Sequence, residues 1–285
     1  MELRASDGRV IALEVVGDHD ATPVLLCHGL ADSRLAAQSL QQAARDLGLR
    51  VIAPDRPGIG GTDRRWLRQL ADWADDAAVV LDALRVDSAA LLGVSGGGPF
   101  AAACAARIPA RVRSLMLVCP LGRAEWPTDG MAQGERLSLA LAVHAPAWGG
   151  WAMGRLATLA RRSPDIFLRL AATNQPDVDI RALRRPDMRE SFLACYVEAF
   201  RSGSWGVAQD LRLLTRPWGF DLGSITAATS IHHGDADTTV PVQHARRYAQ
   251  AIPGARLQIH PGEGHFSILS RPQDILAALA ADELP

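Results

Sequence analysis

The sequence contains no lysine: all 30 of its basic residues are arginine. This absence excludes the mechanisms that need a lysine side chain. A P-loop NTPase would lack the lysine that reaches the nucleotide phosphates. A pyridoxal-phosphate or Schiff-base enzyme would lack its amine, and a protein kinase would lack its strand lysine. We attribute the arginine-only usage to a GC-rich source genome and infer no function from it.

Cysteine is scarce, and the usual motifs of metal and cofactor sites are missing. The four cysteines are far apart and form no C-x-x-C pair, so no zinc or redox motif is visible. No H-E-x-x-H or similar cluster of histidines and carboxylates occurs. The glycines of residues 55–63 do not form the strand-to-helix G-x-G-x-x-G of a dinucleotide site. We therefore expect neither a metal nor a cofactor.

The chain has little net charge and no long apolar run. Its formal charge is −1, which argues against nucleic acid or an anionic membrane as a partner. The first eight residues include no apolar signal core. The longest mostly apolar stretch, residues 137–154, is interrupted by His144, Pro146 and three glycines, so it is too broken for a membrane span. These features favour a cytoplasmic protein.

Short apolar runs alternate along the chain with segments of helical spacing. The 285 residues suffice for one large domain, or for one domain with an insertion. The expected strands are residues 10–16, 23–27, 51–53, 89–94, 115–118, 229–233 and 256–260. The expected helices are residues 34–47, 70–84, 100–107, 242–252 and 267–281. This alternation predicts a parallel sheet with right-handed crossovers and helices on both faces.

The alternation stops after residue 121 and resumes near residue 226. The intervening residues 122–225 hold five of the seven tryptophans and four of the six phenylalanines, but no run typical of a buried strand. We expect them to form several short helices that lie over the sheet. The predicted organisation is a core made of residues 1–121 and 226–285, interrupted by a helical insertion, residues 122–225.

A serine stands at the turn between an expected strand and an expected helix. The sequence Gly93-Val94-Ser95-Gly96-Gly97 fits the pattern G-x-S-x-G. A strained turn at this place exposes the serine hydroxyl, and the flanking glycines let the chain pack closely. The N–H of Gly96 lies at the positive end of the following helix and can donate to an oxyanion. The pattern indicates that Ser95 is a nucleophile.

The loop after the strand of residues 23–27 offers a second oxyanion donor. The glycine of His28-Gly29-Leu30 lets the backbone turn back over the sheet edge, so that the N–H of Leu30 can donate. For the His28 side chain we favour a packing and hydrogen-bonding role within this loop. We expect the loop of residues 55–63 to pack beside the Ser95 turn.

A serine nucleophile needs a base within hydrogen-bond reach and an acid that orients the base. Of the eight histidines we favour His265, because it lies in a glycine-rich loop after the last expected strand, where sites form in parallel sheets. Asp235 and Asp237 both follow the preceding strand. Asp237 is further into its loop and freer to reach a histidine on the next loop, whereas Asp235 is better placed to cap the turn.

These motifs together resemble the α/β-hydrolase family, and the resemblance covers nearly the whole chain. The His28-Gly29 loop, the turn at Ser95, the Gly-x-x-Asp that ends at Asp237 and the Gly-x-Gly-His that ends at His265 occur in the family's order. The resemblance implies a mostly parallel eight-stranded α/β sheet with a helical lid after the sixth strand. The insertion at 122–225 stands where that lid belongs.

The resemblance also implies a role for each candidate residue. Ser95 attacks a carbonyl carbon, His265 takes its proton, and Asp237 orients His265. The backbone N–H groups of Leu30 and Gly96 form the oxyanion hole. The serine rules against the haloalkane dehalogenases and epoxide hydrolases of the family, which use a carboxylate nucleophile.

We therefore expect a serine hydrolase, in particular a carboxylesterase for a small or medium apolar substrate, since the aromatic residues of 122–225 favour an apolar pocket. The same triad also serves amide, lactone, thioester or β-diketone cleavage and cofactor-free oxygenation, and the fold does not decide among them. Another interpretation is a receptor that binds a small molecule with little turnover. Asp210 is a candidate ligand contact, although nothing in the sequence singles it out.

Overall fold

Eight strands form one sheet in the computed structural model, which describes residues 1–282. The strands are β1 (Glu2–Arg4), β2 (Val10–Gly17), β3 (Thr22–Cys27), β4 (Leu49–Pro54), β5 (Ala89–Val94), β6 (Val112–Val118), β7 (Ala228–Gly234) and β8 (Arg256–His260). Their order is β1-β2-β4-β3-β5-β6-β7-β8, and only β1–β2 and β2–β4 pair antiparallel. The predicted mostly parallel eight-stranded α/β sheet is confirmed.

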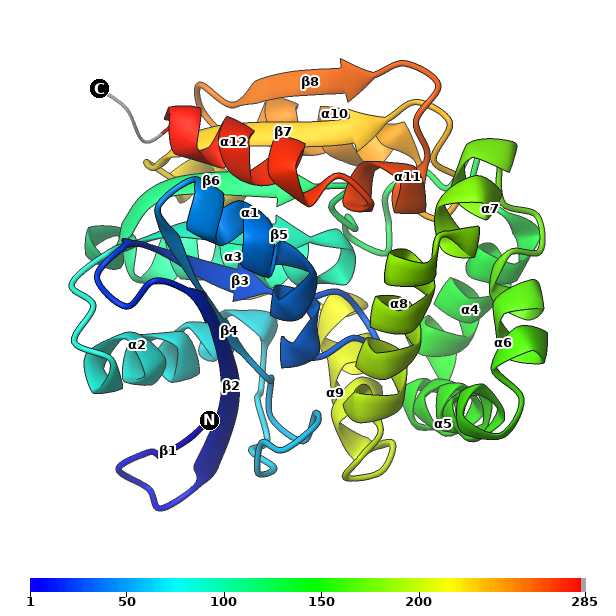
Figure 1. Cartoon of the computed structure of the whole chain (residues 1–285), viewed down its shortest axis with the longest axis horizontal. Helices are drawn as coiled ribbons and strands as arrows, with labels where there is room; N and C mark the ends of the chain where they lie inside the picture. Colours follow the sequence, from blue (N-terminus) through cyan, green and yellow to red (C-terminus); the bar gives the residue numbers. More distant parts are fainter. Residues whose placement is uncertain (283–285) are drawn as a thin grey trace.

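Helices cover both faces of this sheet (Figure 1). One face carries α2 (Trp73–Ala83), α3 (Gly98–Arg107) and α10 (Val242–Ala251), and the other carries the 3₁₀ helix η1 (Arg34–Leu40), α1 (Gln41–Asp46) and α12 (Pro272–Asp282). Side chains alternate between the faces along each strand. In β3, Leu25 packs with Trp73 and Phe100, whereas Val24 and Leu26 pack on the opposite face. Both faces are therefore buried, as the apolar runs predicted.

Three of the five expected helices are each divided into two helices in the structure. The segment 34–47 begins as a 3₁₀ helix and becomes α-helical only at Gln41, and the segment 70–84 likewise begins with the 3₁₀ helix η2 (Leu70–Asp72). The expected helix 267–281 is two helices, α11 (His265–Leu269) and α12. The break precedes Pro272, which has no N–H to continue the hydrogen-bond ladder.

Six helices connect β6 to β7. They are α4 (Gln133–His144), α5 (Pro146–Arg162), α6 (Pro164–Ala171), α7 (Asp177–Arg184), α8 (Pro186–Ala199) and α9 (Trp205–Leu214). We call them the α4–α9 segment. They lie beside the carboxyl ends of the strands, on the right in Figure 1, rather than over a face of the sheet. The segment has an apolar cluster of its own, which includes Phe167, Tyr196 and Phe200.

The helices of residues 1–282 are at most 17 residues long, whereas a helix that spans a bilayer needs about 20 apolar residues. None of them is long and apolar enough to cross a membrane.

Candidate active site

The turn at Ser95 holds a strained backbone at the carboxyl end of β5. Ser95 has a φ of +52° and begins the short 3₁₀ helix η3 (Ser95–Gly97) that leads into α3. Glycine is needed on both sides of it. A Cβ at Gly93 would lie 2.7 Å from the Cβ of Ala101, and a Cβ at Gly97 would lie 2.0 Å from the carbonyl oxygen of Cys27. This close packing keeps Ser95 in a conformation that L-residues seldom adopt.

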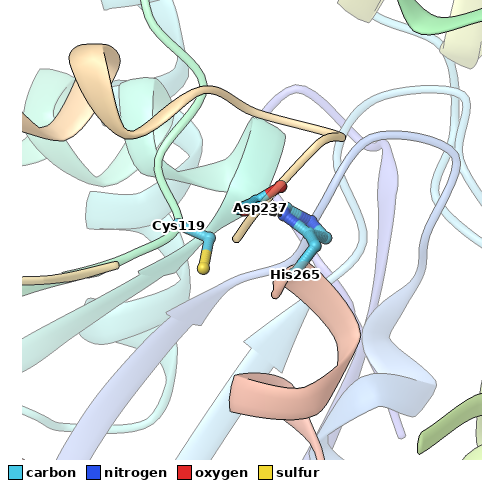
Figure 2. A group of neighbouring side chains, drawn as sticks. All are labelled: Cys119, Asp237 and His265. Carbon is cyan, nitrogen blue, oxygen red and sulfur yellow. Dashed lines mark hydrogen bonds and ion pairs between the residues drawn. The ribbon is translucent and has the colours of Figure 1, made fainter. Parts of the chain in front are cut away.

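Ser95, His265 and Asp237 come together from loops that follow three different strands. His265 Nε2 lies 3.1 Å from Ser95 Oγ, and His265 Nδ1 lies 2.7 Å from Asp237 Oδ2. His265 and Asp237 are buried, and Figure 2 shows their side chains next to each other. With the Nδ1–H donating to Asp237, Nε2 is free to accept the Ser95 proton. The arrangement has the geometry of a nucleophile, a base and an orienting acid.

Further hydrogen bonds fix the loop that carries Asp237. Asp237 Oδ1 accepts from the N–H of Thr239 and of Val240, both at 2.8 Å. Buried His233 lies with Nε2 3.4 Å from Asp237 Oδ2 and donates to the Val240 carbonyl at 2.8 Å. His233 was not predicted to support the acid, although its place at the end of β7 is a signal that could have suggested it. Exposed Asp235 instead accepts from the N–H of Gly262 in the neighbouring loop, at 2.7 Å.

The pKa values of the two buried partners move in opposite directions. Burial by itself lowers the pKa of His265, but the charge and hydrogen bond of Asp237 outweigh it, so this pKa is raised above its ordinary value. Burial by itself raises the pKa of Asp237, but the charge of His265 and the hydrogen bond of His233 hold it well below its usual range. The acid therefore stays ionised while the base titrates.

Leu30 and Gly96 face each other beside Ser95. A Cβ at Gly96 would lie 2.9 Å from the Leu30 nitrogen, and all three residues border the same cavity. The N–H of Gly96 is in the first turn of a helix, where it has no intrahelical acceptor. The N–H of Gly29 donates to Asp32 Oδ2 at 3.1 Å and is occupied. This geometry is compatible with the expected role of the Leu30 and Gly96 N–H groups as donors to an oxyanion.

The His28 side chain is fully buried, and its Nδ1 donates to the Gly29 carbonyl at 3.0 Å. Burial holds the pKa of His28 well below its ordinary value, so the ring is neutral. This arrangement agrees with the packing and hydrogen-bonding role expected from the sequence.

Arg56 holds the loop that contains His28, Gly29 and Leu30, which we call the oxyanion loop, by hydrogen bonds to its backbone. It donates to the carbonyl oxygens of His28 and Gly29 at 2.6 and 2.7 Å, and its guanidinium pairs with Asp210 of α9 at 2.8 Å. Arg56 and Asp210 are each 1% exposed. The suggestion that Asp210 contacts a ligand is therefore wrong: its carboxylate is buried against Arg56 and does not border the cavity. Through Arg56, the loop of residues 55–63 thus holds the backbone of His28 and Gly29, which border the same cavity as Ser95.

A second buried carboxylate of the α4–α9 segment supports the base. Asp179 of α7 is fully buried, and its two oxygens accept from the N–H groups of His265 and Ser267, both at 2.8 Å. Burial raises the pKa of Asp179, while its hydrogen bonds oppose that change. No sequence motif points to Asp179, because this residue lies inside a helix far from the glycine-rich loops.

A cavity of about 420 Å³ opens at Ser95 between the sheet and the α4–α9 segment. Most of its lining is apolar and comes from the loops after β3 and β5 and from helices α4, α5 and α8. Phe192, Tyr196 and Phe266 border it, but within residues 1–282 none of the tryptophans does. The expectation of an apolar pocket agrees with this lining, although tryptophan contributes nothing to it.

Cys119 lies close enough to the triad to suggest a metal site. The ligand atoms of Cys119, Asp237 and His265 are within 4.8 Å of one another (Figure 2). A cysteine binds metal as a thiolate, yet burial raises the pKa of the Cys119 thiol well above its ordinary value. His265 and Asp237 are also engaged with each other and with Ser95. These side chains therefore fit a triad better than a metal centre.

Comparisons with known proteins agree with this arrangement. Residues 22–272 match the family model of the alpha/beta hydrolase fold. The chain is 30% identical over 251 residues to a 2-hydroxymuconate semialdehyde hydrolase of Pseudomonas putida, covering 86% of this chain and 81% of that protein. It is 28% identical over 258 residues to a 2-hydroxy-6-oxo-2,4-heptadienoate hydrolase of Pseudomonas putida, covering 86% and 82%.

Solved structures share the fold. A thermophilic esterase from Thermogutta terrifontis superposes with a TM-score of 0.72 at 23% identity, covering 99% of this chain and 97% of that one. An alpha/beta hydrolase fold protein from Nakamurella multipartita superposes with a TM-score of 0.69 at 26% identity, covering 99% of both chains.

Proposed function

The chain belongs to the α/β-hydrolase family, and on this premise we propose that it is a serine hydrolase that cleaves a carboxylic ester of a small or medium apolar substrate. One observation carries the proposal. Ser95 Oγ lies 3.1 Å from His265 Nε2, with Asp237 behind the imidazole, at the edge of an apolar cavity. A binding protein would need neither the aligned base nor the strained turn that exposes the hydroxyl.

The geometry supports the following mechanism for the proposed reaction. Ser95 Oγ attacks the ester carbonyl carbon while its proton passes to His265 Nε2. Asp237 keeps the imidazole in the productive tautomer and stabilises the imidazolium, and the N–H groups of Leu30 and Gly96 donate to the oxyanion. His265 then returns the proton to the alcohol oxygen as the C–O bond breaks. Water, deprotonated by His265, hydrolyses the acyl ester on Ser95 by the same steps.

We infer that residues 122–225 act as a lid over this chemistry. The cavity is bordered on one side by strand ends and on the other by α4, α5 and α8. A substrate bound at Ser95 would thus be enclosed by side chains of the segment, which would set its size and polarity. The buried residues Asp179 and Asp210 tie the same segment to the base and to the oxyanion loop.

The test is hydrolysis of p-nitrophenyl esters of increasing acyl length by the wild type and by Ser95→Ala. We expect turnover by the wild type, an optimum at short to medium acyl length, and loss of at least about 10³-fold in kcat on Ser95→Ala. Ser88→Ala is the control, because Ser88 stands at the opposite end of β5. Equal activity of wild type and Ser95→Ala would show that Ser95 is not the nucleophile.

A second candidate is hydrolysis of a dienoate like those named for the Pseudomonas relatives, and the 30% identity favours it. Such a substrate carries a carboxylate. Within the described residues no arginine borders the cavity, whereas Glu135 does, and the sequence has no lysine. The Glu135 carboxylate would therefore repel a dienoate anion, which supports ester hydrolysis as the first candidate. Loss of the dienoate absorbance at a higher kcat/KM than for any p-nitrophenyl ester would favour the second candidate.

A further inference from the structure

Glu135 brings an unpaired carboxylate to the cavity. It lies in the first turn of α4 and borders the same cavity as Ser95. Within residues 1–282 its side chain makes no hydrogen bond or ion pair. The chain has many arginines, yet none of those described borders the cavity to neutralise it. The charge of protonated His265 acts on Glu135, but His265 is engaged with Asp237 and Ser95, so a cationic ligand would find the Glu135 carboxylate without a hydrogen-bonded partner.

Asp32, the other carboxylate of the cavity, shows the contrast. Its Oδ2 accepts from the N–H of Gly29 at 3.1 Å, and its Oδ1 accepts from the N–H of Ser33 at 2.7 Å. Asp32 therefore serves the oxyanion loop, and both of its oxygens are occupied. Burial raises the pKa of Glu135; the charge of His265 opposes this change, and the charge of Asp237 adds to it. Glu135 is left as the carboxylate that can meet a ligand.

Aromatic rings border the same cavity as this carboxylate. Phe192 lies with its ring centroid 5.4 Å from that of Phe266 and 6.2 Å from that of Tyr196. Phe266 follows His265 directly, so these rings extend from His265 along the cavity lining. The charge of Glu135 contributes to the raised pKa of Tyr196, after burial. Faces of aromatic rings attract cations, and most strongly where water is excluded.

We propose that the cavity takes an ester that carries a cationic nitrogen, bound by the Glu135 carboxylate and by the aromatic faces of Phe192 and Tyr196. This proposal rests on the proposed ester hydrolysis and names its substrate class. The apolar lining accommodates the alkyl groups around the nitrogen, and the carboxylate supplies the opposite charge. An anionic ester would be disfavoured by the same carboxylate, so the site selects by repulsion as well as by attraction.

The test uses two pairs of esters of equal shape, in which a quaternary nitrogen is replaced by carbon. Choline butyrate and 3,3-dimethylbutyl butyrate differ in the alcohol part. Ethyl 4-(trimethylammonio)butanoate and ethyl 5,5-dimethylhexanoate differ in the acyl part. For each pair the ratio of kcat/KM, cationic over neutral, is measured by acid release. We expect this ratio to fall about tenfold on Glu135→Gln for at least one pair, because the attraction between the carboxylate and the quaternary nitrogen is lost.

Glu190→Gln is the matched control, because Glu190 is exposed on α8 and its loss changes the net charge equally. Both esters of a pair are measured with the same variant. A change in the efficiency of the triad therefore alters both values of kcat/KM equally and leaves their ratio unchanged. The same ratios in wild type and Glu135→Gln for both pairs would overturn the proposal while leaving ester hydrolysis intact. A fall of the cationic-to-neutral ratio in Glu190→Gln as large as in Glu135→Gln would overturn the proposal as well.

If the wild type hydrolyses neither these four esters nor any p-nitrophenyl ester, the proposed function fails, and binding then tests the cation site by itself. Calorimetry with Ser95→Ala should detect the cationic member of a pair binding more tightly than its neutral partner. We expect that preference to fall about tenfold in the double variant Ser95→Ala/Glu135→Gln. Equal binding of both members in Ser95→Ala would contradict the proposal.

Discussion

The sheet and the α4–α9 segment contribute to the site in different ways. Ser95, Asp237 and His265 all lie just beyond strand ends, in turns marked by glycine. The segment contributes three carboxylates that lie inside helices: Glu135, Asp179 and Asp210. The strand ends position the proposed reacting atoms, whereas the helices place charge around them. The first kind of residue is part of a motif, and the second is defined only by what it contacts.

The largest effect is expected on the sheet side, from Asp237→Asn. An amide at this position no longer stabilises the imidazolium and favours the wrong tautomer of His265, so kcat should fall roughly 10³–10⁴-fold. The measurement is ester turnover at saturating substrate. Asp235→Asn is the control, because Asp235 is exposed and bonds only the neighbouring loop through Gly262. A larger loss from Asp235→Asn than from Asp237→Asn would reverse the assignment of the acid.

On the segment side, the largest effect is expected on stability, from Asp210→Ala. The substitution leaves the Arg56 guanidinium buried without an anion, so the free energy of unfolding should fall by about 3 kcal/mol. Urea unfolding measures it. Asp187→Ala removes the exposed pair with Arg185 and should cost less than about 1 kcal/mol. Equal losses of stability in the two variants would show that the buried pair of Arg56 and Asp210 does not hold the α4–α9 segment to the oxyanion loop.

The same contrast explains how far the sequence could be interpreted. The seven expected strands were found within a few residues, because buried parallel strands have continuous apolar runs. β1 was missed because its three residues form no such run. The candidate triad rests on loops with glycine patterns. Asp179 and Arg56 were missed because their partners are backbone atoms of distant loops, and no local pattern encodes such contacts.

A smaller effect is expected from Asp179→Asn, and it should appear in the pH profile. Catalysis needs neutral His265, and its pKa is raised, so wild-type kcat/KM should rise with pH through a midpoint above about 6.5. The Asp179 charge contributes to that raised pKa. Asp179→Asn should therefore shift the midpoint to lower pH and, because one hydrogen bond to the first turn of α11 is lost, reduce kcat about tenfold.

Asp177→Asn controls for a general change of charge, since Asp177 is exposed on the same helix. A reduced kcat with an unchanged midpoint in Asp179→Asn would mean that Asp179 only braces the fold. A shift of equal size in Asp177→Asn would mean that the effect is long-range and not specific to the buried carboxylate.

The smallest effect is expected on the outer face of the segment, from Trp148→Gln and Trp151→Gln. The two side chains are 66% and 55% exposed on α5, and neither borders the cavity. Each substitution should change the free energy of unfolding by less than about 0.5 kcal/mol and leave the acyl-length optimum in place. Trp218→Leu is the contrast, because Trp218 is 2% exposed in the core and its loss should cost about 3 kcal/mol. A changed acyl-length optimum in Trp148→Gln would mean that the outer face reaches the substrate, and that the separation between reacting strand ends and surrounding helices is less complete than the contacts indicate.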